Sequence, residues 1–241
     1  MTKKIENIGI IIPLANESKT LVDLYNAIDI SISHLKEKYT VYFVVDKASR
    51  DNTKELCEDI CNKDDRFVTV WGENNKNAID AYMLGYKVAF DNKHDAFIEM
   101  DGGLSHDPKE IAVFTSLLNE GYECVFGCRF ALGGEIKDSR ISRHFLSRAG
   151  TTLSNFLLGM HFNDGTSGFI GLRKSALKLI FSHGIRSKSH FYQTEMRFIL
   201  KNLKWIETPI YYKSPSASVS SKSIKNSIYL LIFYTIKRIL W

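Results

Sequence analysis

Residues 41–53, with the sequence VYFVVDKASRDNT, decide the fold of this chain. Residues 41–46 form an apolar run that ends on Asp46, as in a strand that is buried on both faces of a sheet. Residues 51–53 are of types that cap helices, and apolar residues follow them at helical spacing. The stretch therefore predicts a buried strand, a polar turn and a helix, which is the repeating unit of a mostly parallel α/β sheet.

The same alternation continues on both sides of this stretch. Further buried strands are predicted at residues 8–13, 67–71, 96–100 and 123–127, and helices at residues 16–32, 77–90 and 108–119. The second half is less regular, with helices predicted at residues 142–159, 193–202 and 223–241 and strands at residues 167–172 and 205–212. Ligands of such sheets bind beyond the carboxyl ends of the strands, where Asp46 and Asp101 lie.

The length fits one large domain, or one domain with an appendage. Of the 241 residues, 44% are hydrophobic and 24% are charged, which excludes a fully disordered protein. Residues 1–120 contain 14 Lys or Arg and 21 Asp or Glu, whereas residues 121–241 contain 18 and 6, which together make the 32 and 27 of the whole chain. We therefore expect the basic second half to meet an anionic partner, such as phosphates, a membrane surface or nucleic acid.

The cysteines and the termini place few constraints on function. Cys57, Cys61, Cys124 and Cys128 form two C-x3-C pairs, not the C-x2-C of common zinc sites. We expect buried free thiols and a reducing compartment. No signal peptide is apparent, and the apolar run at residues 226–236 is shorter than the ~20 residues that a spanning helix needs.

Residues 99–108, EMDGGLSHDP, carry the first candidate site. A carboxylate at the end of a buried strand, followed by two glycines that let a ligand approach the backbone, suits a divalent cation that also binds a diphosphate. The same pattern fits a glycine turn in which Asp101 caps the next helix. In the same way, Asp46 suits recognition of a nucleotide base or ribose, or belongs to an ordinary turn.

Basic residues form the second candidate site. Arg129 is followed by Arg140, Arg143 and Arg148, and Ser147 shares a helix face with Arg143. Guanidinium groups bind phosphate in a bidentate manner, although a solvated basic face fits the pattern as well. These arginines do not interleave with an aromatic stacking platform, so nucleic-acid binding is not expected.

Taken in order, these stretches resemble the family 2 glycosyltransferases of GT-A fold, in particular the dolichyl- and polyprenyl-phosphate mannose synthases. The matching positions are Ile12-Pro13, Asn16-Glu17, Val45-Asp46, Met100-Asp101, Ser105-His106, Gly127-Cys128-Arg129, Ser142-Arg143, Ser147-Arg148, Asp164 to Phe169, Gln193, Glu195 and Ser221-Lys222. The resemblance implies an α/β fold with a Rossmann-like, mostly parallel sheet flanked by helices over residues 1–222. Within it, residues 1–120 would bind the nucleotide and metal, and residues 121–222 the acceptor.

The resemblance also implies roles for single residues. The nucleotide pocket would contain Pro13, Glu17 and Asp46. The donor and acceptor would be bound by Ser105, Asp164, Gln193 and Lys222. The catalytic set would be Asp101, Arg129, Arg143, Ser147 and Glu195, with Asp101 as the ligand of Mg²⁺ or Mn²⁺.

The chain departs from the family pattern at three places. Lys47 stands where a second acid usually follows Asp46, and Gly103 replaces the second Asp of the Asp-x-Asp metal motif. Glu99 lies two residues before Asp101 on a strand, so it is expected to share the face of Asp101 and to compensate for Gly103. The Ser-rich loop at residues 214–221 lacks the arginine that relatives more often carry there.

The activity implied is an inverting transfer of a hexose, mannose-like or glucose-like, from a GDP- or UDP-linked sugar to a polyprenyl or dolichyl phosphate. A phosphate acceptor is already an anion and needs no general base, whereas a sugar hydroxyl needs one, for which Glu195 is the candidate. Two alternatives stay open. One is a family 2 enzyme that acts on a saccharide hydroxyl in surface-glycan synthesis, and the other is a degenerate, non-catalytic nucleotide-sugar binder.

Residues 223–241 form a separate feature, an apolar helix with Lys222, Lys225, Lys237 and Arg238 at its ends and Trp241 as the last residue. This pattern is typical of an amphipathic helix at a membrane surface, and equally of a helix packed on the core or in a homo-oligomer. We expect a peripheral enzyme at the cytoplasmic face of a membrane, held by this helix or by a membrane-anchoring partner.

Overall fold

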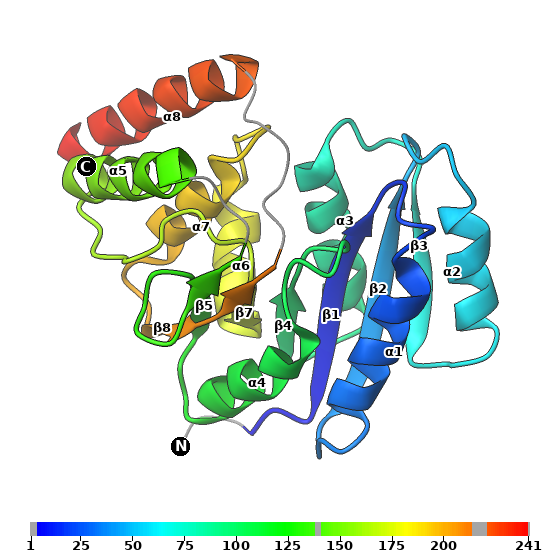
Figure 1. Cartoon of the computed structure of the whole chain (residues 1–241). Helices are drawn as coiled ribbons and strands as arrows, with labels where there is room; N and C mark the ends of the chain where they lie inside the picture. The colour runs from blue at the N-terminus through cyan, green and yellow to red at the C-terminus, as the bar shows by residue number, and fades with distance from the viewer. Residues whose placement is uncertain (1–3, 138–140, 214–220, 241) are drawn as a thin grey trace.

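A computed structural model describes residues 4–137, 141–213 and 221–240, and only the backbone of residues 141–144 and 240 (Figure 1). Its first half contains β1 (Asn7–Leu14), α1 (Leu21–Ile32), β2 (Lys38–Asp46), α2 (Thr53–Cys61), β3 (Phe67–Gly72), α3 (Ala78–Asp91), β4 (Ala96–Glu99), the 3-10 helix η1 (Pro108–Glu110) and α4 (Ile111–Asn119). The second half contains β5 (Cys124–Cys128), β6 (Glu135–Ile136), α5 (Ile141–Leu158), β7 (Ile170–Arg173), α6 (Lys174–His183), α7 (Tyr192–Leu200), β8 (Trp205–Pro209), β9 (Tyr211–Tyr212) and α8 (Ser221–Leu240).

Seven strands form the central sheet, in the order β3-β2-β1-β4-β7-β5-β8. All the neighbouring pairs are parallel except those of β7, which runs antiparallel to both β4 and β5. The predicted mostly parallel α/β sheet is therefore confirmed. The middle parts of β1 and β2, residues 8–12 and 41–45, are apolar and buried because both faces of these strands are covered, as the run at residues 41–46 predicted.

Two hydrophobic cores lie on the two faces of the sheet. Alternate residues of β1 point to opposite cores: Ile10 and Ile12 pack with residues of α1, α2 and α4, while Ile11 packs with α3. The core on the α3 side also takes in residues of α6, α7 and α8. Figure 1 shows α1 and α2 at one end of the molecule and α5 and α8 at the other.

The structure corrects several predicted boundaries. Helix α1 begins at Leu21 and not at residue 16, because Asn16 has a positive φ of 59° and its Oδ1 accepts a hydrogen bond from the Arg50 N–H (2.9 Å). The strand predicted at residues 205–212 is divided at Ile210, and β9 pairs with β6 in a separate two-stranded sheet. Helix α6 has no counterpart among the predicted elements.

Helix α8 confirms the predicted C-terminal helix and packs along α5 (Figure 1). Leu230 and Tyr234 bury one side of it in the core. At the C-terminal end of α5, the backbone carbonyl groups of Phe156 and Leu157 accept hydrogen bonds from the Arg238 guanidinium. Within the described part of the chain, no helix is long and apolar enough to cross a membrane.

The four cysteines are free thiols, of which three are buried and Cys61 is half-buried. Burial raises the pKa of the Cys57 thiol to about 12, so this thiol is unreactive.

Some of the predicted features lie outside the described residues. They are Arg140, Trp241, most of the Ser-rich loop (residues 214–220) and the side chain of Arg143.

Candidate functional site

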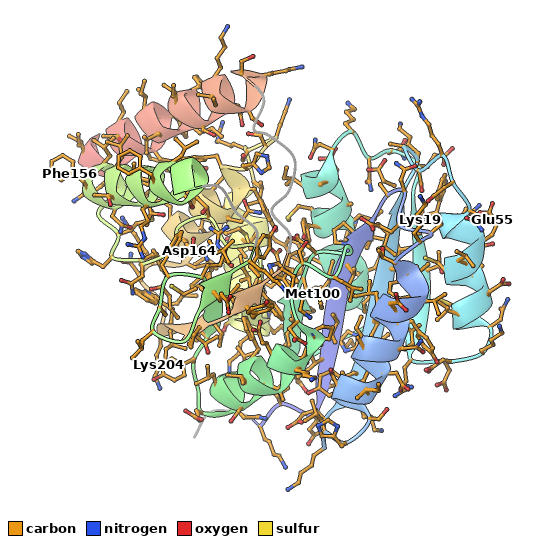
Figure 2. The ribbon with its side chains drawn as sticks, viewed as in Figure 1. Lys19, Glu55, Met100, Phe156, Asp164 and Lys204 are labelled. Atoms are coloured by element: carbon orange, nitrogen blue, oxygen red, sulfur yellow. The ribbon has the colours of Figure 1, made fainter. Side chains whose placement is uncertain are left out.

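The candidate site lies at the carboxyl ends of β1, β2 and β4, as the alternation predicted. Pro13, Asp46 and Asp101 come from these three strand ends and are all partly exposed. Figure 2 marks Met100, the residue before Asp101, near the centre of the molecule, between the first half of the chain and Asp164 of the second half.

Asp101 is oriented by three aromatic side chains from different elements. The Tyr82 hydroxyl of α3 donates to its Oδ1 (2.9 Å), and the Tyr212 hydroxyl of β9 donates to its Oδ2 (3.5 Å). The backbone N–H of Asp101 donates to Nδ1 of His106 (3.1 Å), which leaves the ring proton on Nε2, 3.9 Å from Oδ2. Burial lowers the pKa of His106, so the ring is neutral near pH 7. The carboxylate is held in place and stays 37% exposed.

Glu99 is the last residue of β4, two positions before Asp101, but its carboxyl group is not exposed at the candidate site. Its carboxyl group is fully buried, and its Oε2 accepts hydrogen bonds from the hydroxyls of Tyr86 (2.8 Å) and Tyr192 (2.9 Å). Burial raises the pKa of Glu99 to about 8, so the neutral acid predominates at pH 7. The expectation that Glu99 compensates for Gly103 as a metal ligand is therefore wrong, because the group is enclosed and mostly uncharged.

The donor set at Asp101 nevertheless fits a hard divalent cation. Asp101 offers a fixed, partly exposed carboxylate, and Ser105 and Glu17 offer oxygen atoms on the neighbouring loops. Among the described residues, no three His, Cys, Asp or Glu side chains come together as a complete metal site. Mg²⁺ and Mn²⁺ do not require one, since they bind through one or two carboxylates together with substrate phosphates and water.

Arg129 follows β5 and forms the second part of the site. Its Nε and Nη2 donate to the two oxygens of Asp164 at 2.7 and 2.8 Å, and Nη2 also donates to Thr166 Oγ1 (2.5 Å) and Ser147 Oγ (3.3 Å). Burial alone would lower the pKa of Arg129, but the Asp164 carboxylate outweighs it and raises the pKa. The guanidinium is therefore a fixed, permanent cation, and only 14% of the side chain is exposed.

Asp164 plays a different part from the one predicted. Its carboxylate is fully buried, and besides Arg129 it binds the backbone N–H of Thr166 (3.1 Å). Burial tends to raise the pKa of Asp164, and Arg129 lowers it below the ordinary value. Because the Asp164 carboxylate is fully buried, it does not contact the sugar donor or the acceptor substrate directly; it positions Arg129. The structure brings Ser147, predicted in the same set as Arg129, to within 3.3 Å of the Arg129 guanidinium.

Tyr212 joins the two parts of the site. Its hydroxyl contacts Asp101, its ring lies 5.2 Å from the ring of His106, and the guanidinium of Arg129 lies 5.6 Å from its centroid. The preceding residue, Tyr211, donates its backbone N–H to Glu110 Oε1 (2.6 Å), which ties β9 to η1. Sequence reasoning missed Tyr212 because only the folded chain brings it across from β9.

The predicted nucleotide-binding residues line the edge next to β2. Asp46 Oδ1 accepts a hydrogen bond from the Ala48 N–H (2.8 Å), and Lys47 is exposed beside it. Asp51 bridges two loops, since its carboxylate accepts from the backbone N–H groups of Ser18 (3.1 Å) and Thr53 (3.2 Å). Asp51 thus links the first residue of α2 to the loop that carries Glu17, while the N-cap position of α2 is Asn52, whose side chain makes no capping hydrogen bond.

Of the two residues predicted on α7, the structure brings only Gln193 to the site. A Cβ built on Gly168 would lie 3.4 Å from Gln193 Nε2 and 3.7 Å from Asp101 Oδ1, so these two groups flank the same glycine. Glu195 is fully buried and accepts hydrogen bonds from the backbone N–H groups of Arg186 and Ser187 (2.8 Å each) and from the Tyr234 hydroxyl. Its role as a general base is therefore not supported, because the carboxylate anchors α8 instead.

Two further predicted residues have peripheral positions. Lys222 is exposed on the first turn of α8. The Ser105 carbonyl accepts a hydrogen bond from the Lys213 N–H (2.9 Å), which links the loop after Asp101 to the end of β9.

Comparison with known proteins agrees with this site. A family model described as Glycosyl transferase family 2 matches residues 9–181, which include Glu17, Asp46, Asp101, Arg129 and Asp164. This chain belongs to glycosyl transferase family 2. The enzyme class follows from the family: the protein is a glycosyltransferase.

Relatives of this glycosyltransferase include two bacterial enzymes. It is 27% identical to the polyprenol monophosphomannose synthase of Mycolicibacterium smegmatis over 90% of this chain and 81% of that protein. It is also 27% identical to the undecaprenyl-phosphate mannosyltransferase of Micrococcus luteus, over 80% of this chain and 82% of that protein.

Solved structures confirm the fold of this glycosyltransferase. The glucosyl-3-phosphoglycerate synthase of Mycobacterium tuberculosis, determined with Mn²⁺, UDP and glucosyl-3-phosphoglycerate, matches with a TM-score of 0.66 and 13% identity, over 97% of this chain and 80% of that chain. S. aureus TarS, residues 1–349 in complex with UDP, matches with a TM-score of 0.64 and 16% identity, over 95% of this chain and 65% of that chain. At these identities the likeness establishes the GT-A fold.

Proposed function

We propose that this enzyme transfers a hexose from a nucleotide diphosphate sugar to a polyprenyl phosphate, with inversion at the anomeric carbon. The observation that carries the proposal is the Arg129 guanidinium, held by the buried Asp164 and joined through Tyr212 to Asp101. This arrangement sets a fixed cation beside a carboxylate that suits a divalent metal. The names of the bacterial relatives support a lipid-linked phosphate as the acceptor.

The residues of the site would have separate roles in moving a sugar from a diphosphate to a phosphate acceptor. Asp101 would hold Mg²⁺ or Mn²⁺, which neutralises the charge that develops on a departing diphosphate. Within the described structure, Arg129 Nη1 has no hydrogen-bond partner, while Nε and Nη2 are engaged, so Nη1 is the donor available to a phosphate oxygen. The acceptor phosphate is already an anion and needs no general base, which agrees with the enclosed positions of Glu99 and Glu195.

The surface made by α5 and α8 supports an acceptor at a membrane. Ser147 of α5 contacts Arg129, while other side chains of α5 and α8 are large, apolar and exposed. They are Phe145, Leu146, Leu153, Phe156, Ile224, Ile228, Tyr229, Ile232, Ile236 and Ile239. Arg148, Lys222 and Lys225 lie exposed among them, as expected where a protein meets anionic lipid. We call this surface the α5–α8 face, and we propose that it rests on the cytoplasmic side of a membrane.

Nucleotide release tests the proposal. Purified enzyme is incubated with GDP- and UDP-linked hexoses and Mg²⁺ or Mn²⁺, with polyprenyl phosphate, with saccharides, or with no acceptor. Release of nucleotide only with polyprenyl phosphate is the expected result. Release only with saccharides would show a hydroxyl acceptor, and no release from any donor by folded enzyme would show a non-catalytic binder. The donor that is used identifies the base and the sugar.

A further inference from the structure

The carboxylate of Glu17 lies where a side chain on residue 103 would point. A Cβ built on Gly103 would lie 3.4 Å from Glu17 Oε1 and 3.7 Å from Glu17 Oε2. The backbone of Gly103 is outside the left-handed region, so its conformation does not demand glycine. The Glu17 carboxylate therefore lies within van der Waals contact of the point where a side chain at position 103 would begin.

The loop that carries Glu17 is firmly placed. The backbone N–H of Glu17 donates to Thr53 Oγ1 (2.9 Å), and its carbonyl accepts the N–H of Leu21 (2.9 Å) at the start of α1. The Thr20 hydroxyl donates to Oε2 (2.7 Å) and so orients the carboxylate. Among the described residues nothing donates to Oε1, the oxygen nearest to the Cβ position of Gly103. One oxygen is thus anchored and the other is available.

We propose that Glu17 supplies the second carboxylate of the divalent-cation site, in the space that Gly103 leaves open. The inference rests on the proposed function, in which the cation and its nucleotide diphosphate bind at Asp101. Two carboxylates, phosphate oxygens and water make a ligand set that Mg²⁺ and Mn²⁺ accept. An aspartate at position 103 would place a second negative charge close to the Glu17 carboxylate, and the like charges would repel. Glycine at 103 and glutamate at 17 therefore act as a pair.

The first experiment measures Mn²⁺ affinity directly. Electron paramagnetic resonance follows free Mn²⁺ as it is titrated into the full chain with UDP or GDP, for the wild type and for Glu17→Gln. Glutamine keeps the size and the acceptor for Thr20 but removes the charge. We expect the Mn²⁺ affinity of the nucleotide complex to fall about tenfold or more, since affinity follows the number of charged ligands. Nucleotide affinity should fall by a smaller factor without Mn²⁺ than with it.

Two further variants serve as control and rescue. Glu55→Gln makes the same change at an exposed position on α2 (Figure 2) and should leave Mn²⁺ affinity at the wild-type value. Glu17→Gln combined with Gly103→Asp returns a carboxylate to the same space and should restore most of the lost affinity. Thermal unfolding of each variant checks that it is folded.

The outcomes separate this inference from the proposed function. Unchanged Mn²⁺ affinity in Glu17→Gln would overturn the inference alone, because the wild type would still bind the metal and release nucleotide. An equal loss of nucleotide affinity with and without Mn²⁺ would also overturn it, since Glu17 would then contact the nucleoside only. A wild type that binds no Mn²⁺ with either nucleotide would overturn both proposals.

Discussion

The polar site at the strand ends and the α5–α8 face are built in opposite ways. At the strand ends, Asp101 and Arg129 each have fixed partners, and Arg129 is almost completely buried. On the α5–α8 face, the side chains of Phe145 and Phe156 are 75% and 80% exposed. The first region is thus preorganised for charge, and the second is the surface that we propose rests on a membrane. The following changes test the two regions separately.

The largest effect is expected at Asp101. Asp101→Asn keeps an acceptor for the Tyr82 hydroxyl but removes the negative charge, so nucleotide release should fall about 100-fold or more while the fold is retained. Steady-state rates at saturating Mn²⁺ and circular dichroism measure the two quantities. Asp59→Asn, at an exposed position of α2, is the matched control. Equal rates in the wild type and Asp101→Asn would show that the Asp101 carboxylate has no role in the reaction.

The next effect concerns the buried ion pair. Asp164→Asn leaves the guanidinium of Arg129 buried without its carboxylate, which should lower the free energy of unfolding by about 3 kcal/mol. Urea unfolding followed by fluorescence measures the change. The double variant with Arg129→Met should recover part of the loss, because the unpaired charge is then absent. A loss in the double variant as large as the sum of both single losses would contradict a buried pair.

Arg129→Lys separates charge from geometry in the same region. Lysine retains the positive charge but not the planar fork that binds Asp164, Thr166 and Ser147 together, so kcat should fall about tenfold. Polyprenyl phosphate transfer assays measure kcat and KM. A rate like that of the wild type would show that a single point charge is sufficient.

The α5–α8 face should give a smaller effect, and only with membranes present. Phe145→Ser with Phe156→Ser should weaken binding to anionic vesicles about tenfold, because each exposed ring contributes on the order of 1 kcal/mol when it enters the lipid interface. Transfer to a short, water-soluble polyprenyl phosphate should be unaffected. Ile30→Ser, at an exposed position of α1 on the other side of the molecule, is the control (Figure 1). Unaltered sedimentation with vesicles would assign this face to another partner, such as a second copy of the chain.

The smallest effect is a change in the pH dependence of stability at Glu110. Burial raises the pKa of Glu110 to about 7, so between pH 4.5 and 7 the folded state holds a proton that the unfolded state releases. The stability of the wild type should therefore fall as the pH rises through this range, relative to Glu110→Gln. The difference should be about 0.5 kcal/mol, because the side chain is partly exposed. Urea unfolding at pH 5, 6 and 7.5 measures it, and parallel curves for the two proteins would contradict it.

The two regions also differ in how much of them could be predicted. The positions of Asp46 and Asp101 followed from the sequence, because a strand end is a local property and parallel strands end at one edge of the sheet. The helix of α8 and its apolar character were likewise predicted, but the pattern did not decide which of its apolar residues are buried and which are exposed. The exposed apolar residues of α5 were not predicted, because an apolar helix face that is exposed has the same sequence pattern as one that packs in the core.

Burial separated the acidic residues that looked alike. Glu99, Asp164 and Glu195 were all expected to act near the metal or the substrates, and the structure buries all three side chains. No local pattern distinguishes a carboxylate that faces a ligand from one that binds a buried arginine or tyrosine. The distinction depends on which distant elements cover the residue, and here these are α3, α7 and α8.

The sequence by itself determined the α/β alternation, the parallel sheet, the ends of its strands and the separation of an acidic half from a basic one. These features depend on periodicity and composition, which are properties of short stretches. Only the tertiary structure decided the partners: Tyr212 reaches Asp101 across 111 positions, Asp164 reaches Arg129 across 35, and Glu17 lies against Gly103. Contacts of this kind depend on the path of the whole chain, because no local sequence pattern indicates which distant loops the fold will bring together.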